Sequence, residues 1–290
     1  MPAVLAALSS ILVWSTLAVL TTRTVDLPPL FSSGVALCIG GLAGIVRIRD
    51  WRIPLRTLAV GSGGIFGYHA LLFLAFSLAP AVEVNLINYL WPLLIVLLSP
   101  LFLPGYALKP AHAAGVLLGL AGAFLIVGGG RLDLDLSRLP GYLSAAAAAF
   151  VWAAYSLQTK RLPPFGSGAV GLFCLVSGAF SLALWAALDP TGTLPPALAS
   201  DTAISLVLLG LGPMGLAFYT WDAALKRGDP RVIGSLAYLT PLLSTLNLVV
   251  LGGKRLSSAT ALAMLLIIAG AVLGATAGSG AGRGGRSDPR

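Results

Sequence analysis

Long uncharged stretches alternate with short charged segments along the chain. Ten stretches of at least 20 residues contain no Asp, Glu, Lys or Arg. They run over residues 1 to 22, 27 to 46, 57 to 82, 84 to 108, 110 to 130, 139 to 159, 162 to 188, 202 to 221, 232 to 253 and 256 to 282. An α-helix needs about 20 residues, at a rise of about 1.5 Å each, to cross a hydrocarbon core about 30 Å thick. The pattern therefore predicts an all-α integral membrane protein with ten transmembrane helices.

The composition supports a membrane protein and excludes several soluble classes. Hydrophobic residues make up 57% of the 290-residue chain and charged residues only 10%, whereas soluble proteins carry about 25% charged residues. The net charge of +8 does not indicate a nucleic-acid partner, because Lys and Arg lie at span ends without a cluster that could follow a phosphate backbone. Cys38 and Cys174 lie inside predicted spans, where we expect small buried side chains rather than a disulfide.

The distribution of basic residues predicts the orientation of the chain. Ten spans put both termini on one side of the membrane, and that side carries 13 basic residues against 5 on the other. The 13 are Arg47, Arg49, Arg52, Arg56, Lys109, Lys160, Arg161, Lys226, Arg227, Arg231, Arg283, Arg286 and Arg290; the 5 are Arg23, Arg131, Arg138, Lys254 and Arg255. The positive-inside rule predicts that both termini lie in the cytoplasm. We expect a multi-pass protein of the cytoplasmic (inner) membrane. Residues 278 to 290, Gly-rich and basic, are expected to form a disordered cytoplasmic tail.

The chain contains two similar halves. VWSTLAVLTTR at 13 to 23 aligns with VWAAYSLQTKR at 151 to 161, and NYLWPLL at 88 to 94 aligns with AYLTPLL at 237 to 243, in the same order. We interpret residues 1 to 130 and 131 to 277 as a duplicated five-helix unit. Because five is odd, the two units lie in the membrane with opposite orientation. Inverted repeats with a site between them are typical of secondary transporters that work by alternating access; the alternative is a duplication that only enlarged the bundle.

These motifs also resemble a known family. The 5+5 inverted arrangement, Trp14 in the first span, NYLWPLL and AYLTPLL in the fourth and ninth, and the Gly- and Ala-rich fifth and tenth spans are similar to the drug/metabolite transporter superfamily, EamA type. The resemblance implies a secondary transporter rather than an enzyme. We expect no cofactor and no metal, a small-molecule substrate and membrane lipid as partners, and a monomer rather than an oligomer.

Two proline motifs predict interruptions within spans. Asn85, Asn88, Tyr89 and Pro92 follow the spacing i, i+3, i+4 and i+7, which places them on one face of a helix. Pro92 has no N–H to donate to the carbonyl of Asn88, so the helix bends and that oxygen needs another partner. Pro241 occupies the matching position in the second half. We therefore expect hinges at Pro92 and Pro241.

The candidate substrate-binding residues are the aromatic and polar side chains within the spans. Trp14 and Trp152 are mid-span, where an indole N–H needs a partner. His69 is an intramembrane ionisable residue; a neutral, hydrogen-bonded role is preferred to proton coupling. Glu83 and Asp222, near span ends, are expected to be solvated. The full set is Trp14, Tyr68, His69, Asn88, Tyr89, Trp91, Trp152, Tyr155, Tyr219 and Tyr238.

The absence of charged side chains from the middle of the spans limits the class of substrate. A phosphorylated solute needs a mid-span Lys or Arg and a lipophilic cation needs a central carboxylate, and neither is present. Aromatic faces with amide dipoles suit a neutral or zwitterionic solute, so we predict export of amino acids with aromatic or otherwise apolar side chains. The alternatives are export of another small neutral metabolite or drug and, in other classes, a channel or an intramembrane enzyme. Facilitated diffusion and proton exchange both remain open.

Overall fold

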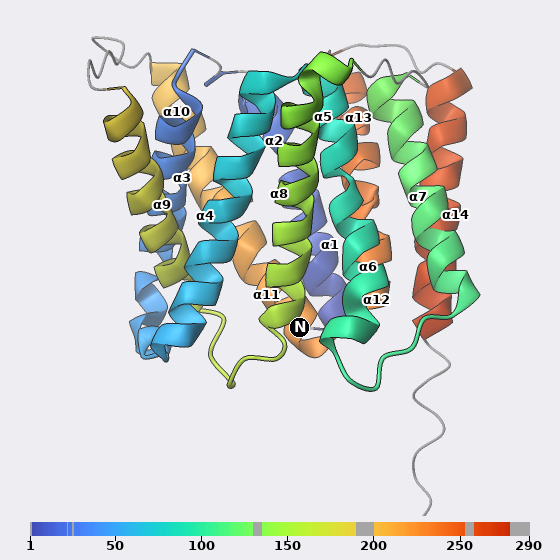
Figure 1. Ribbon diagram of the computed structural model, residues 1–290, viewed down its shortest axis with the longest axis horizontal. Helices are drawn as coiled ribbons and strands as arrows, with labels where there is room; N and C mark the ends of the chain where they lie inside the picture. The colour runs from blue at the N-terminus through green and yellow to red at the C-terminus, as the bar shows by residue number, and fades with distance from the viewer. Residues whose placement is uncertain are drawn as a thin grey trace, which may run out of the picture.

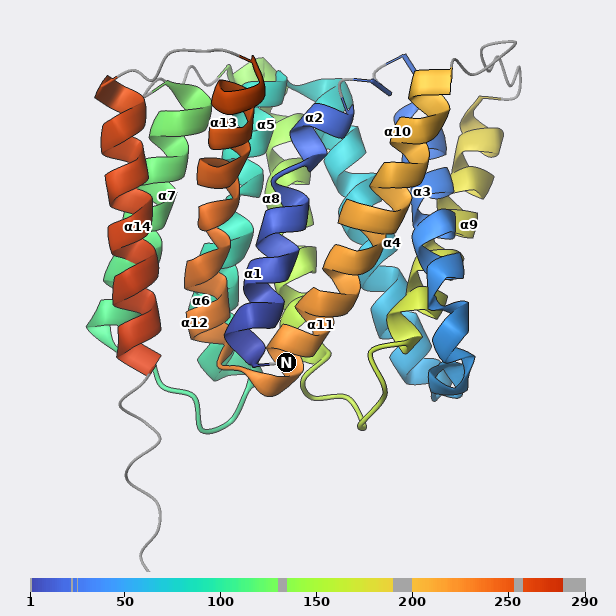
Figure 2. The same ribbon diagram turned by 180° about the vertical axis from the view of Figure 1, so that it is seen from behind.

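The computed structural model describes residues 2–21, 23–24, 26–129, 135–189, 200–252 and 258–278, and in these ranges the chain is helical without a β-strand. The helices stand side by side in one bundle (Figure 1, Figure 2). Eight of them are long and apolar enough to cross a membrane. The chain is thus an all-helical, multi-pass membrane protein. The expected tail lies outside the described residues, apart from Gly278, which ends the last helix.

The helices follow one another in the order expected from the uncharged stretches. The first part of the chain forms α1 (Ala3–Trp14), α2 (Leu17–Thr21), α3 (Pro29–Ala43), the 3-10 helix η1 (Gly44–Trp51), α4 (Leu55–Leu78), α5 (Ala81–Asn88), α6 (Leu90–Phe102) and α7 (Pro110–Gly128). The second part forms η2 (Leu136–Arg138), α8 (Leu139–Gln158), α9 (Ala169–Leu188), α10 (Ser200–Leu211), the π-helix η3 (Gly212–Leu216), α11 (Ala217–Arg227), α12 (Pro230–Ala237), α13 (Leu239–Gly252) and α14 (Ser258–Gly278).

Helix α8 stands in the middle of the bundle and contacts α4, α5 and α6. It is 20 residues long but is not among the eight most apolar spans. Its sequence contains five consecutive alanines from Ala145 to Ala149. Because small side chains let neighbouring helices approach closely, a helix with much of its surface packed against other helices does not need high hydropathy.

The interruptions expected from the proline motifs are present. Helix α5 ends at Asn88 and α6 begins at Leu90, so Pro92 lies in the first turn of α6. Helix α12 ends at Ala237 and α13 begins at Leu239, so Pro241 lies in the first turn of α13. In the first turn of a helix, the missing proline N–H has no intrahelical partner to lose. Each proline therefore starts a new helix after the break.

One end of the bundle carries most of the basic residues, and we call it the basic end. Helix α1 begins and α14 ends there (Figure 1). A Cβ atom placed on Gly228 would lie 2.8 Å from the Cβ atom of Ala3, and Lys109 Nζ donates to the carbonyl of Ala277 at 3.0 Å. The opposite end carries the ion pair between Arg23 and Asp201, with N and O 3.1 Å apart.

Helices α7 and α14 pack through glycines. A Cβ atom placed on Gly115 would lie 2.8 Å from both the carbonyl oxygen of Gly270 and the nitrogen of Gly274. Both obstacles are backbone atoms, which cannot rotate away. The two helices therefore approach as closely as they do because neither has a side chain at the crossing.

We predict that Gly115→Ala lowers the free energy of unfolding by about 1–3 kcal/mol, the usual cost of overpacking. Thermal unfolding in detergent measures the effect. Gly63→Ala is the matched control, because a Cβ atom at this exposed helical glycine meets nothing within 4 Å. The control should be neutral or stabilising by up to about 1 kcal/mol; equal losses in the two variants would contradict this account of the helix crossing.

Candidate binding site

Aromatic rings from five helices meet in the bundle, and Trp152 of α8 lies at their centre. Its ring centroid lies 5.0 Å from that of Tyr68, 5.3 Å from Phe218, 5.5 Å from Tyr155 and 6.0 Å from Trp14. All these contacts are tilted or edge-on, the geometry that aromatic rings prefer. We call the whole group the aromatic cluster: Trp14, Tyr68, His69, Trp91, Trp152, Tyr155, Phe218 and Trp221.

The close approach of α4 and α8 positions part of the cluster. A Cβ atom on Gly64 of α4 would lie 2.6 Å from the Tyr155 ring. Tyr68, one turn further along α4, contacts Trp152. The glycine thus allows the α4 backbone to lie against an aromatic face of α8, and the next turn adds a ring to the cluster.

The polar atoms of the cluster are mostly paired inside the protein. Trp14 Nε1 donates to the carbonyl of Pro213 in the π-helix at 3.1 Å, and Trp221 Nε1 donates to Ser156 Oγ at 3.1 Å. His69 Nδ1 lies 2.8 Å from the carbonyl of Ile65. Because a carbonyl only accepts, Nδ1 carries the hydrogen, and the Nε2 atom of a neutral His69 can accept one.

Asn88 has one polar atom without a partner. Its Nδ2 donates to the hydroxyl of Tyr68 at 3.2 Å, which ties the amide to the cluster. Its Oδ1 is buried and makes no hydrogen bond within the described part of the chain. An unpaired buried acceptor costs about 1–3 kcal/mol. This oxygen is therefore ready to accept a hydrogen bond from a ligand beside the rings.

Three of the expected site residues lie away from the aromatic cluster and from Asn88, which is bonded to it. Tyr219 donates to the carbonyl of Gly40 at 2.9 Å, between α11 and α3. Tyr238 donates to the carbonyl of Tyr89 at 3.1 Å, at the break between α5 and α6. Tyr89 lines a hollow against α7 with Leu117 and other apolar residues, and none of the ring contacts in the described ranges involves it. The other seven expected residues lie together.

Three further residues belong to this site and were not expected from the sequence. Phe218 and Trp221 belong to the cluster, and Ser156 is the acceptor for the Trp221 indole. Phe218 and Trp221 are spaced i and i+3, so they share a helix face, and this spacing was a usable signal. They lie four residues and one residue before Asp222, at the end of the uncharged stretch 202 to 221.

Asp222 is not solvated, contrary to the sequence-based expectation. Helix α11 continues to Arg227, and the side chain of Asp222 is only 1% exposed. Its Oδ2 lies 2.7 Å from Lys226 Nζ and accepts from Ser167 Oγ at 2.6 Å. Lys226, one turn later on the same helix, supplies the compensating charge. The ion pair lets a carboxylate lie inside a span, directly after Trp221.

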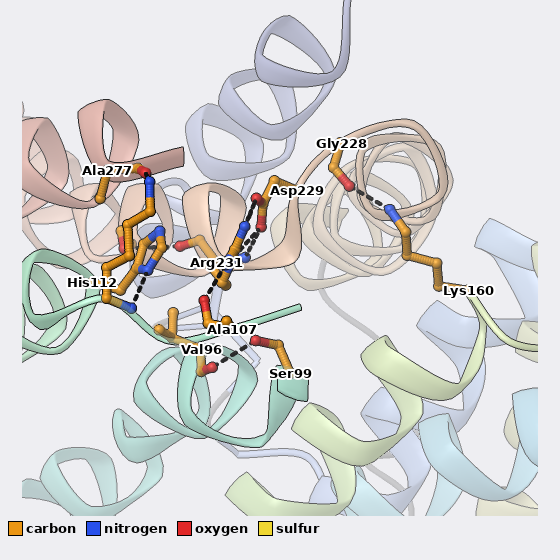
Figure 3. A network of polar contacts seen from close by, with 11 residues as sticks. Val96, Ser99, Ala107, His112, Lys160, Gly228, Asp229, Arg231 and Ala277 are labelled. Carbon is orange, nitrogen blue, oxygen red and sulfur yellow. Dashed lines mark hydrogen bonds and ion pairs between the residues drawn. The ribbon is translucent and has the colours of Figure 1, made fainter. Parts of the chain in front are cut away.

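A network of polar contacts at the basic end includes Lys160 and Arg231 (Figure 3). The Tyr106 ring centroid lies 5.7 Å from Lys160 Nζ and 5.1 Å from Arg231 Cζ. Figure 3 shows Arg231 between Asp229 and the carbonyl of Ala107, and Lys160 directed at the carbonyl of Gly228. Burial acts to raise the pKa of Asp229, but the hydrogen bonds from Arg231 and its positive charge together outweigh burial, so the pKa is lowered. The carboxylate therefore stays ionised at neutral pH.

No group of three or more His, Cys, Asp or Glu residues in the described ranges could hold a metal ion. The site is a group of rings with a few neutral hydrogen-bonding atoms, inside apolar helices. Such a site can hold a solute by ring contacts and hydrogen bonds.

These features belong to a multi-pass membrane transporter. The chain matches the EamA-like transporter family over residues 1–128 and 139–276 and belongs to this family. It is 42% identical to the aromatic amino acid exporter YddG of Ancylobacter novellus, over 93% of this chain and 96% of that protein. It is 29% identical to the exporter of the same name from Escherichia coli, with the same shares covered. One solved crystal structure, 42% identical, matches with a TM-score of 0.89 over 96% of this chain and 97% of that one.

We predict that Lys226→Met destabilises the protein by about 3–5 kcal/mol, because it leaves the buried Asp222 carboxylate without its cation. The double variant Asp222→Asn with Lys226→Met should recover most of this loss, since no unpaired charge remains. Chemical unfolding in detergent measures both. Arg23→Met is the control: its ion pair with Asp201 is exposed and is worth less than about 1 kcal/mol. A double variant no more stable than Lys226→Met would contradict the interpretation.

Proposed function

We propose that this protein is a secondary transporter that exports aromatic amino acids from the cytoplasm across the inner membrane. The observation that carries the proposal is the aromatic cluster with the unpaired acceptor Asn88 Oδ1 beside it. The names of the two relatives, aromatic amino acid exporters, support the same substrate class. A single chain supplies the whole site, so a monomer is sufficient.

The chemistry of the site suits both parts of such a substrate. An aromatic side chain can join the tilted and edge-on contacts around Trp152, each worth about 0.5–1.5 kcal/mol beyond the buried area. The α-ammonium group can donate to Asn88 Oδ1 and lie over a ring face as a cation. The cluster contains no Lys, Arg, Asp or Glu, so the site favours a zwitterion over a solute with net charge.

We infer a ten-span arrangement of two inverted five-helix units, residues 1–130 and 131–277, with both termini in the cytoplasm. Two observations support it. The start of α1 and the end of α14 lie at the basic end, which the positive-inside rule assigns to the cytoplasm. The proline breaks at Tyr89 and Tyr238 lie at matching places in the two units. Helices α8 and α12 with α13 then complete the ten spans.

Alternating access follows from this arrangement. Toward the basic end, α8 is buried at every position from Trp152 to Leu157, and α12 from Ile233 to Ala237. Trp14 and Tyr68 in the cluster are only half-buried. We infer that this conformation is closed to the cytoplasm by the network around Tyr106. Movement about the breaks before Pro92 and Pro241 opens that end and closes the other.

The function is tested in proteoliposomes loaded with radiolabelled phenylalanine, tyrosine or tryptophan. We predict saturable, protein-dependent efflux that other aromatic amino acids inhibit by competition. Trp152→Ala should reduce efflux by about tenfold or more, the effect of losing about 1.4 kcal/mol of ring contacts, and Asn88→Leu should weaken it by a similar factor by removing the acceptor.

Trp185→Ala is the matched control for Trp152→Ala. Its ring contacts Phe31, with centroids 5.0 Å apart, and takes no part in the cluster, so efflux should be preserved. Efflux of apolar aliphatic amino acids or neutral drugs, but not of aromatic amino acids, would support export of another neutral metabolite instead. Absence of flux for the whole set would refute the proposal.

The orientation is tested with single cysteines in a chain whose Cys38 and Cys174 are replaced by Ala. Arg52→Cys places a thiol at the basic end, and Leu136→Cys places one at the opposite end, where Leu136 is 81% exposed. We predict that a membrane-impermeant maleimide added to intact cells labels Leu136→Cys, and labels Arg52→Cys only after the cells are opened. The reverse pattern would overturn the orientation.

A further inference from the structure

Four arginines between the end of α3 and the start of α4 have unpaired side chains, unlike most other basic residues in the described ranges. The side chains of Arg47, Arg49, Arg52 and Arg56 are all exposed and make no ion pair or hydrogen bond within these ranges. Elsewhere, Arg23, Arg138, Lys226 and Arg231 pair with carboxylates, and Lys109 and Lys160 donate to carbonyls. The four arginines therefore keep their full capacity to bind an anion.

The nearest carboxylate does not neutralise this group. Asp50 Oδ2 accepts from the backbone nitrogen of Gly168 at 3.1 Å. The adjacent Trp51 donates from Nε1 to the carbonyl of Gly168 at 3.0 Å. These two hydrogen bonds fasten η1 to the loop between α8 and α9, so the arginines stand on a fixed backbone. The segment has four positive charges against the single negative charge of Asp50.

Large apolar side chains are exposed on the same segment. Val46 is 85% exposed, Ile48 53% and Leu55 78%. Val46, Arg47, Ile48, Arg49 and Asp50 line a hollow of about 550 Å³, so two of the arginines and two of the apolar side chains border the same space as the carboxylate of Asp50. A soluble anion would contact only the arginines and leave the apolar side chains exposed. An anionic phospholipid would contact both, because its acidic headgroup lies directly beside its acyl chains.

We propose that η1 and the start of α4 form a binding site for an anionic phospholipid. The phosphate group lies among Arg47, Arg49, Arg52 and Arg56, and the first part of an acyl chain lies against Val46, Ile48 and Leu55. Arginine suits this role because its planar guanidinium donates two parallel hydrogen bonds to one phosphate. The site is distinct from the aromatic cluster and does not depend on the substrate.

The test is native mass spectrometry of the full chain in detergent, titrated with phosphatidylglycerol or with phosphatidylcholine of the same acyl chains. The protein should bind phosphatidylglycerol more tightly than phosphatidylcholine. Replacing the four arginines by Gln should weaken phosphatidylglycerol binding by about fivefold for each arginine, the effect of one basic residue near an anionic surface. Replacing them by Lys should weaken binding less than replacing them by Gln, because the charge is kept while the paired hydrogen bonds are lost; binding by the Lys variant also shows that substitution there leaves the protein folded.

The control variant carries Arg23→Gln, Arg138→Gln and Arg161→Gln, three exposed basic residues elsewhere, and should bind phosphatidylglycerol as the unmodified chain does. Equal binding of the two lipids, unchanged binding in the four-Gln variant, or an equal loss in the control would overturn the proposal. Inorganic phosphate should not displace the lipid; displacement would assign the arginines to a soluble anion instead.

Discussion

The interior of a bilayer offers no water to a backbone carbonyl, and the structure depends on this constraint. Each helix interruption frees carbonyls that must find a donor within the protein. Trp14 supplies one, with its Nε1 3.1 Å from the oxygen of Pro213 in the π-helix. Tyr238 supplies another, with its hydroxyl 3.1 Å from the oxygen of Tyr89. Trp14 and Tyr238 thus stabilise the interrupted helices through the polar ends of their side chains.

The sequence predicted the helices well because in this chain charge marks the ends of spans. Trp14 and Trp152, whose ring centroids lie 6.0 Å apart, stand out in the sequence because both lie in the middle of predicted spans and occupy matching positions in the two halves. The prolines predicted where the helices break, since a missing N–H is a local property of the residue. These features depend on spacing and residue type alone.

The features that the sequence did not predict depend on three-dimensional contacts. Asp222 was taken to mark a span end, but Lys226 neutralises it and the helix continues to Arg227. Phe218 and Trp221 lie inside the predicted stretch 202 to 221, but their contacts with Trp14 and Trp152 join helices that are far apart in the sequence. The expectation that Asn88 and Tyr89 share one face assumed a continuous helix. The break at Tyr89 separates them, so Asn88 contacts Tyr68 while Tyr89 lines the hollow beside α7.

The aromatic cluster also gives the protein an internal optical signal. Four of the six tryptophans, Trp14, Trp91, Trp152 and Trp221, lie within it, with neighbouring centroids 5.2 to 6.4 Å apart. Indole transitions at such separations couple, and the sign and size of the resulting circular dichroism depend on the angles between the rings. Any rearrangement of α1, α6, α8 and α11 therefore changes the circular dichroism of the unlabelled protein. The indole absorption band lies at longer wavelength than the band of a phenylalanine side chain.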